Sequence, residues 1–230
     1  MTTELIATPP RVTRDRAVGA AMSRLDYFAP FCYSPRGPSQ SAERSRCLRT
    51  LIKQAHPGAL DRCLQRLRTM IDLGVTPAFL SIPSLALVPL PRRTPTGRLG
   101  ASAPAVLIGQ RLLEAGVGAV LWPALGRIRP LAKSAWAHPG TRPEFHEHYD
   151  SLALVECDPP SRQVLLVDDV VTRGRTLLSA AMRLRDALPQ IEVYAFALLR
   201  TDGLSPDIEQ ITAPLCGTIR LLGGDAFRRP

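Results

Sequence analysis

The chain of 230 residues lacks the features that mark membrane and secreted proteins. No apolar run reaches the length of about 20 residues that a transmembrane helix needs. Residues 1–10 lack the charged and then apolar pattern of a signal peptide. The cysteines are odd in number and widely spaced, and no two form a Cys-x-x-Cys pair, which indicates neither a disulfide framework nor a zinc site. They are Cys32, Cys47, Cys63, Cys157 and Cys216. We therefore expect a cytoplasmic protein with reduced cysteines and no membrane contact.

Acidic residues are scarce beside basic ones, because 20 Asp and Glu stand against 29 Lys and Arg. The imbalance lies at the front of the chain, where residues 1–70 hold 12 Lys and Arg and 5 Asp and Glu. Two amphipathic patterns, separated by His56-Pro-Gly58, predict helices that each bury an apolar stripe and carry basic residues beside it. The basic residues are Arg46, Arg49, Lys53, Arg62 and Arg66.

These basic residues allow two interpretations. One is a solvated flank on two packing helices, and the other is a surface for an anionic partner, either nucleic acid or a polyanionic substrate. Aromatic residues make up only 5% of the chain, and none lies within the two predicted helices. A surface that binds single-stranded nucleic acid needs aromatic platforms for base stacking, so we favour the flank.

Apolar runs and helical patterns alternate from Leu80 onward, and no internal repeat interrupts them. This order predicts an α/β fold with a mainly parallel sheet flanked by helices. Strands are expected at 85–88, 117–122, 152–155, 164–167 and 191–199, and a helix at 105–114. The expected organisation is a basic helical N-terminal extension over 1–79, a core over 80–201, and a C-terminal hood or tail over 202–230.

The most informative segment is Val164-Leu-Leu-Val-Asp-Asp-Val-Val-Thr-Arg-Gly-Arg-Thr176. Its unbroken apolar run is typical of a strand buried on both faces of a parallel sheet. The following acids, Asp168 and Asp169, therefore lie at the carboxyl end of that strand, where open α/β sheets bind ligands. Apolar residues at helical spacing begin at Leu177, so the loop from Thr172 to Thr176 wraps the N-terminus of a helix. The free N–H groups of that helix end attract a phosphate.

The loop residues suit a sugar phosphate. Gly174 allows close approach of the backbone, and Thr172 and Thr176 add hydroxyl donors. Two adjacent carboxylates would repel the phosphate itself, so Asp168 and Asp169 are better interpreted as acceptors for the vicinal hydroxyls of a ribose. The simpler alternative is an ordinary buried strand followed by helix-capping Asp and Thr residues.

This segment resembles the 5-phosphoribosyl 1-diphosphate (PRPP) motif of the type I phosphoribosyltransferases, which is a strand, two acids, two apolar residues and a Thr-x-Gly-x-Thr loop. The resemblance implies that Thr172, Arg173, Gly174, Arg175 and Thr176 grip the 5-phosphate and that Asp168 and Asp169 contact the ribose. Arg173 departs from the pattern, since many members carry a second Thr there. The layout is similar to ComF-type phosphoribosyltransferase-like proteins, although their N-terminal four-cysteine zinc module is missing.

Two further loops fit this interpretation. Arg92 and Arg93 follow the stiff segment Val88-Pro-Leu-Pro91, and forked guanidinium donors suit a diphosphate. The resemblance places a diphosphate loop at this point in the order of elements. A long cationic loop at about 127–150 corresponds to the loop that closes over the substrate in that family, where Lys133 and Arg142 would contact the diphosphate. His146 and His148 flank Glu147, but packing or exposed histidines explain this pattern better than a metal site.

The sequence thus predicts a phosphoribosyltransferase that uses PRPP, with Mg²⁺ bound through PRPP, and transfers phosphoribosyl to or from an unidentified nitrogenous base. The alternatives are a noncatalytic PRPP-sensing or nucleic-acid-binding protein of the ComF-like type, and a phosphohydrolase-like use of the acidic pair. No upstream metal-binding cluster accompanies the pair, which argues against the last. A homodimer is left open, and no residue is assigned as a direct metal ligand.

Overall fold

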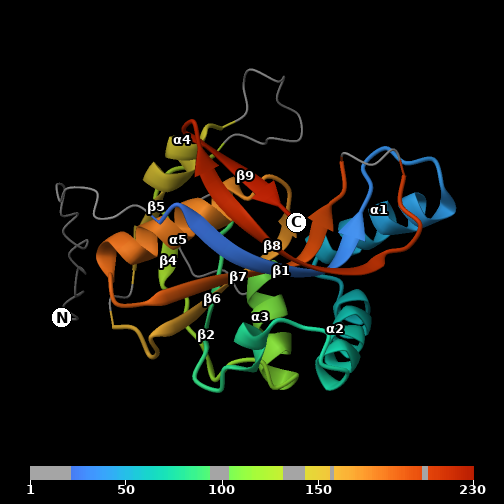
Figure 1. Cartoon of the computed structure of the whole chain (residues 1–230), viewed down its shortest axis with the longest axis horizontal. Helices are drawn as coiled ribbons and strands as arrows, with labels where there is room; N and C mark the ends of the chain where they lie inside the picture. Colours follow the sequence, from blue (N-terminus) through green and yellow to red (C-terminus); the bar gives the residue numbers. More distant parts are fainter. Residues whose placement is uncertain (1–21, 94–103, 132–142, 156–157, 204–206) are drawn as a thin grey trace, which may run out of the picture.

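Apolar runs separated by turns form the strands of a seven-stranded sheet (Figure 1). The structure is a computed structural model that describes residues 22–93, 104–131, 143–155, 158–203 and 207–230. The strands of this sheet are β1 (Arg24–Tyr33), β2 (Ala86–Pro89), β3 (Val120–Leu121), β6 (Gln163–Val171), β7 (Glu192–Thr201), β8 (Thr212–Leu222) and β9 (Asp225–Arg229). Their order is β3-β2-β6-β7-β1-β8-β9, in which the neighbours from β3 to β1 are parallel and the last two pairs antiparallel. The expected α/β fold with a mainly parallel sheet is confirmed.

Helices cover both faces of the sheet (Figure 1). They are α1 (Gln40–Lys53), α2 (Pro57–Asp72), α3 (Pro104–Glu114), α4 (Phe145–Asp150) and α5 (Arg175–Ala187), with the 3-10 turn η1 (Ala78–Ser81). Side chains of α1, α2 and α3 are buried with Leu165 and Val167 of β6, whereas those of α4 and α5 are buried with Val164 and Leu166. Alternate residues of β6 thus face opposite helical layers, as the unbroken apolar run predicts. Within the described ranges, no helix is both long and apolar enough to cross a membrane.

The N-terminal part of the chain differs from the expected helical extension. The two predicted helices form as α1 and α2, but β1 precedes them and lies between β7 and β8 inside the sheet. Phe28 and Phe31 of β1 are buried in the same cluster as Leu60 of α2. The boundary expected at residue 79 therefore does not separate an extension from a core, because residues on both sides of it build one sheet.

The C-terminal segment also belongs to the sheet. The predicted hood or tail over 202–230 contains β8 and β9, an antiparallel hairpin in which Thr218 pairs with Arg229 and Leu222 with Asp225. β8 pairs with β1 from Arg24 to Phe31. The hairpin thus extends the parallel strands by two antiparallel ones at the far edge from β3 (Figure 1).

One predicted strand lies outside the main sheet. Residues 152–155 were expected in the parallel core, but β5 (Leu152–Leu154) pairs antiparallel with β4 (Leu125–Arg127) in a separate two-stranded sheet. Gly126 and Ala153 are paired at its centre. The small sheet places Arg127 at its end, which brings that side chain to the site described below.

Candidate functional site

The acidic pair lies late in β6, at the carboxyl end of the parallel strands. β6 extends through both acids to Val171, beyond the expected end at Val167. Because strand side chains alternate, Asp168 shares the face of Leu166 beneath α5, and Asp169 shares the face of Val167 beneath α1–α3. The Asp169 backbone N–H donates to Asp168 Oδ1 over 2.9 Å, which ties the two residues together.

Lys53 at the end of α1 contacts the acidic pair directly. Its Nζ lies 2.6 Å from Asp169 Oδ1, and the Asp169 side chain is only 8% exposed. In the sequence, Lys53 is one of five basic residues beside the apolar stripes of the two predicted helices. Burial, and next the negative charge of Asp169, raise the pKa of Asp168 above its ordinary value, and the positive charge of Lys53 opposes that rise.

The predicted phosphate loop turns from β6 into α5. Gly174 is the N-cap of α5 and has a φ of 89°, a left-handed conformation that glycine adopts without strain. A Cβ on Gly174 would lie 2.6 Å from Ile219 Cδ1 on β8, so packing as well as conformation requires glycine here. The expected helix start at the loop is therefore confirmed, and the loop rests against the C-terminal hairpin.

The side chains of the loop contact three other parts of the chain. Thr172 Oγ1 lies 3.2 Å from Thr201 Oγ1 at the end of β7. Thr176 Oγ1 lies 3.2 Å from Nδ1 of His148 on α4. The two hydroxyls thus join the loop to β7 on one side and to α4 on the other.

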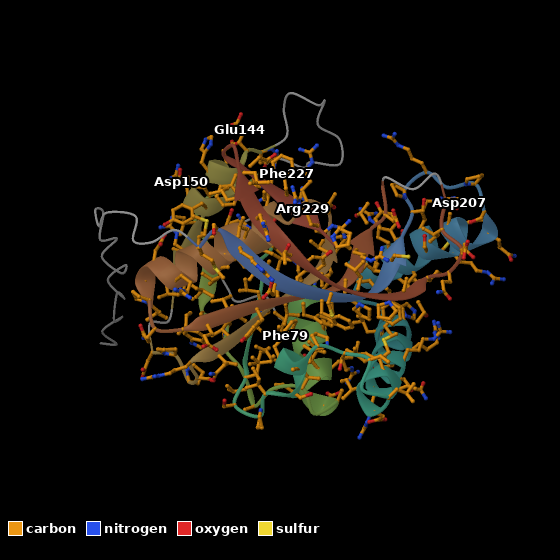
Figure 2. The ribbon with its side chains drawn as sticks, viewed as in Figure 1. Phe79, Glu144, Asp150, Asp207, Phe227 and Arg229 are labelled. Carbon is orange, nitrogen blue, oxygen red and sulfur yellow. The ribbon has the colours of Figure 1, made fainter. Side chains whose placement is uncertain are left out.

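The two arginines of the loop are paired with Asp225, a carboxylate at the start of β9 that no sequence pattern places here. Arg175 donates from Nε and Nη2 to the two oxygens of Asp225, each over 2.5 Å, and Arg173 Nη1 lies 3.4 Å from Asp225 Oδ2. Arg175 also donates from Nη1 to the Pro143 carbonyl just before α4. Arg175 therefore links α4 to the start of β9; Figure 2 labels Glu144, at the N-terminal end of α4, and Phe227 on β9. The charge of Arg175 is therefore compensated within the protein by Asp225.

The predicted diphosphate arginines lie next to the acidic pair in the sheet. β2 is the parallel neighbour of β6, with Pro89 opposite Val167, and the Leu90 N–H donates to the Val167 carbonyl over 2.9 Å. Arg92 and Arg93 follow two and three residues after Leu90 and are exposed. They therefore leave the sheet at the same edge as the acids.

A buried arginine, Arg127 on β4, supports this segment. Its Nε donates to the Arg92 carbonyl over 2.9 Å, and its Nη1 donates to the Ser151 hydroxyl. Burial, and next the charge of Arg93, lower the pKa of Arg127 to about 10, while Asp168 opposes this shift. At neutral pH Arg127 is still a cation, positioned near both Arg93 and Asp168. The sequence shows no local signal for this role, because Arg127 is one of several cations in the predicted loop at about 127–150.

The remaining predicted site residues have separate outcomes. Lys133 and Arg142 lie outside the described residues. His146 is exposed and lies 3.4 Å from Glu144. Among the residues that the structure describes, no group of three or more His, Cys, Asp or Glu side chains could hold a metal ion by itself.

The basic residues of α1 and α2 mostly contact the chain itself. Arg46 donates to the Gly37 carbonyl over 2.9 Å, Arg49 lies over the Tyr33 ring, and Arg66 donates to the Thr212 hydroxyl. Lys53 is paired with Asp169. These contacts explain four of the five basic residues without a nucleic-acid partner.

His148 gives the site a testable pH dependence. Burial, and next the charges of Arg127, Arg93 and Arg175, lower the pKa of His148 to about 4 from an ordinary value of 6.5. Between these values the unfolded chain binds a proton that the folded protein does not, so acid favours unfolding and stability falls as the pH drops. We expect His148→Gln to lose less stability than the wild type between pH 7 and pH 4, measured by urea denaturation at each pH. His146→Gln is the exposed control; an equal loss in His148→Gln and the wild type would contradict the prediction.

No protein-family profile matches the chain, and no curated protein is significantly similar to it. The function is therefore argued from the site alone.

Proposed function

We propose that this protein is a phosphoribosyltransferase that binds PRPP and transfers its phosphoribosyl group to a nitrogenous base. The observation that carries the proposal is the position of Asp168 and Asp169 at the carboxyl end of β6, directly before a Thr-Arg-Gly-Arg-Thr loop that begins α5. Asp168 and Asp169 would accept hydrogen bonds from the ribose hydroxyls. The loop N–H groups and the positive end of the α5 dipole would bind the 5-phosphate.

The neighbouring strand supplies the second anion site that PRPP requires. Arg92 and Arg93 leave β2 beside β6, and the buried Arg127 fixes the backbone of that segment through the Arg92 carbonyl. A ribose bound at the acidic pair would therefore have its 5-phosphate toward α5 and its diphosphate toward β2. This arrangement separates the two phosphate sites in the way that the two ends of PRPP demand.

The site also fits Mg²⁺ carried by the ligand. The ion would be held by the diphosphate and ribose oxygens of PRPP, since the described residues contain no acidic cluster that would hold it without the ligand. When bound to the diphosphate, Mg²⁺ would neutralise part of the charge on the leaving group.

Catalysis at this site would consist mainly of positioning and charge stabilisation. The acidic pair would orient the ribose and stabilise positive charge that develops at its C1 carbon as the bond to diphosphate breaks. Arg92, Arg93 and Arg127 would stabilise the departing diphosphate. A ring nitrogen of the base then forms the new bond at C1.

The direct test is turnover of isotope-labelled PRPP with purine, pyrimidine and nicotinate-type bases. Transfer of label to one of these bases, together with release of diphosphate, is the expected result and names the substrate. PRPP binding without transfer to any base would instead indicate a PRPP-sensing protein. No binding of PRPP would overturn the proposal.

The two anion sites can be separated by substitution. Arg92→Ala with Arg93→Ala is expected to weaken PRPP binding roughly 10- to 100-fold, because charge-assisted hydrogen bonds to the diphosphate are lost. The affinity for ribose 5-phosphate should remain unchanged, since that ligand has no diphosphate. Calorimetry with both ligands measures the difference.

A matched control for this pair is available on α2. Arg62→Ala with Arg68→Ala removes the same charge from two exposed positions. It should leave both affinities unchanged. If the Arg92 and Arg93 double variant weakens both ligands equally, the division of the site into two anion sites is wrong.

A further inference from the structure

The ion pair between Lys53 and Asp169 joins the N-terminal helix to the motif strand. Lys53 Nζ lies 2.6 Å from Asp169 Oδ1, with the Lys53 side chain 44% exposed and the Asp169 side chain 8% exposed. Lys53 is the last residue of α1, where the negative end of the helix dipole favours a cation. The ammonium group of Lys53, at the C-terminal end of α1, is therefore the counter-charge of the buried Asp169 carboxylate.

The position of α1 over the sheet is fixed by three other contacts. Ile52 is fully buried against the sheet, and Arg49, one turn before Lys53, lies over the ring of Tyr33 at the end of β1. At the other end of the helix, Ser39 caps α1 through Ala42 N–H and bonds to Asp207. These contacts determine where the Lys53 ammonium lies, so its approach to Asp169 is a consequence of how α1 packs.

The acidic pair needs such a cation. Asp168 and Asp169 are adjacent carboxyl groups that repel each other when both are charged, and Asp169 is buried, so its charged form is costly without a partner. The charged groups acting on Asp168 are Asp169 on β6, Lys53 on α1 and Arg127 on β4. Among them, Lys53 makes the direct ion pair with Asp169.

We propose that Lys53 is a positioning residue of the ribose site, which supplies the counter-charge of the buried Asp169 and holds its carboxylate in place so that the acidic pair can accept hydrogen bonds from the ribose hydroxyls. This inference rests on the proposed function. This role gives α1 a function beyond covering the sheet, since its Lys53 then supplies the counter-charge of Asp169 on β6. Lys53 Nζ donates to Asp169 Oδ1, and a hydroxyl of the ribose would be accepted by the second oxygen of the same carboxylate.

The alternative is that the ion pair only fastens α1 to the sheet. A structural fastening would change stability and the ligand-free titration of the carboxyl groups, because any charged partner shifts a carboxyl group, but it would leave ligand affinity and its pH dependence unchanged. The positioning role predicts a change in affinity and in its pH dependence as well. The two roles therefore give different results in one set of variants.

The test uses the full chain with Lys53→Met, which removes the charge but keeps the length of the side chain, and Lys53→Arg, which keeps the charge. Arg44→Met is the matched control, because Arg44 is an exposed cation on the same helix. The first measurement is a carbon NMR titration of the Asp168 and Asp169 carboxyl groups without ligand. The second is calorimetry with PRPP and ribose 5-phosphate from pH 6 to pH 9.

In Lys53→Met we expect the protonation midpoint of the acidic pair to rise by about one pH unit or more. Affinity for both ligands should fall about tenfold at pH 7, a loss of the size that a one-unit shift produces, and should recover toward pH 9, where the carboxyl groups ionise without help. Lys53→Arg should retain the wild-type midpoint and affinity, and Arg44→Met should match the wild type throughout.

The outcomes separate this inference from the proposed function. If the wild type binds PRPP and Lys53→Met binds both ligands with unchanged affinity and an unchanged pH profile, the inference is overturned and the proposed function stands, whatever the ligand-free midpoint. If the wild type binds neither ligand, the proposed function fails together with the ribose role of Lys53. The ligand-free titration then still decides whether Lys53 keeps the pair ionised.

Discussion

Gly174→Ala is expected to lower the free energy of unfolding by about 2–5 kcal/mol. Two physical effects combine at this position. The φ of 89° strains any residue with a Cβ, and that Cβ would lie 2.6 Å from Cδ1 of the buried Ile219. The cost of the variant, measured by urea denaturation, should therefore exceed the cost of conformational strain alone.

A second glycine of the chain separates the two effects. Gly224, in the turn between β8 and β9, has a φ of 80°, and a Cβ there would meet no atom within 4 Å. Gly224→Ala should cost about 1–2 kcal/mol from conformation alone. In an Ile219→Ala background, Gly174→Ala should lower the free energy of unfolding by about the same small amount as Gly224→Ala, because Ile219→Ala removes the side-chain atoms that a Cβ at position 174 would overlap. Equal costs for Gly174→Ala and Gly224→Ala in the wild-type background would refute the packing role.

A larger residue at position 174 would affect the predicted phosphate loop in two ways. The sequence suggests that a larger residue at position 174 blocks the approach of a phosphate to the backbone. The structure shows that it also forces β8 and the loop apart, so lost binding in such a variant would combine two causes. Thr176→Ala removes a hydroxyl donor without creating an overlap and is the cleaner probe of ribose 5-phosphate binding.

Asp168→Asn is expected to weaken PRPP binding about 30-fold, because a neutral amide replaces the charged acceptor of the ribose hydroxyls. The single variant is preferable to the double variant with Asp169→Asn, which would also break the ion pair with Lys53. Calorimetry measures the affinity. The control is Asp72→Asn, which removes an exposed carboxylate at the end of α2 and should leave PRPP binding unchanged.

The same substitution should stabilise the ligand-free protein at neutral and alkaline pH. The pKa of Asp168 is raised in the folded state, first by burial and then by Asp169, so the folded protein binds a proton more tightly than the unfolded chain. Folded stability therefore falls as the pH rises from about 4, the ordinary value, through the raised pKa. Asparagine removes this loss, and the difference from the wild type should disappear below about pH 4. A variant that is less stable than the wild type at pH 8 would contradict the prediction.

The parts of the fold that the sequence predicted are those encoded by local patterns. The run Val164–Val167 is uniformly apolar because both of its faces are covered, and this alone identifies a central parallel strand. Apolar stripes identified α1 and α2 for the same reason. The apolar residues at helical spacing from Leu177 onward likewise predicted α5.

The missed features depend on residues that are far apart in the chain. β1 contains Pro30, which reads as a turn signal, yet the proline lies where the pairing with β8 shifts register between Ala29 and Phe31. A proline is tolerated at such an irregularity because no ladder hydrogen bond is required from its nitrogen. No local pattern could show that this strand belongs between β7 and β8.

The missed site residues have the same cause. Lys53 and Arg127 belong to short patterns that carry several similar cations, and nothing near them in sequence distinguishes them. What distinguishes them is their contacts, Lys53 with the buried Asp169 and the buried Arg127 with the Arg92 carbonyl, and only the packing of α1 and β4 creates these contacts. Asp225 likewise meets Arg175 only because the hairpin returns to the phosphate loop.

The position of β1 has a consequence for synthesis of the protein. Phe28 pairs with Phe196 on one side and with Cys216 on the other, so both neighbours of this early strand are translated late. A nascent chain therefore carries the aromatic residues of β1 and two unpaired strand edges while the ribosome produces most of the remaining sequence. Insertion of β1 between β7 and β8 has to wait for residues beyond 212 and closes very long loops, which is slow. Until that step, chaperones that bind exposed apolar strands would have β1 as their natural target.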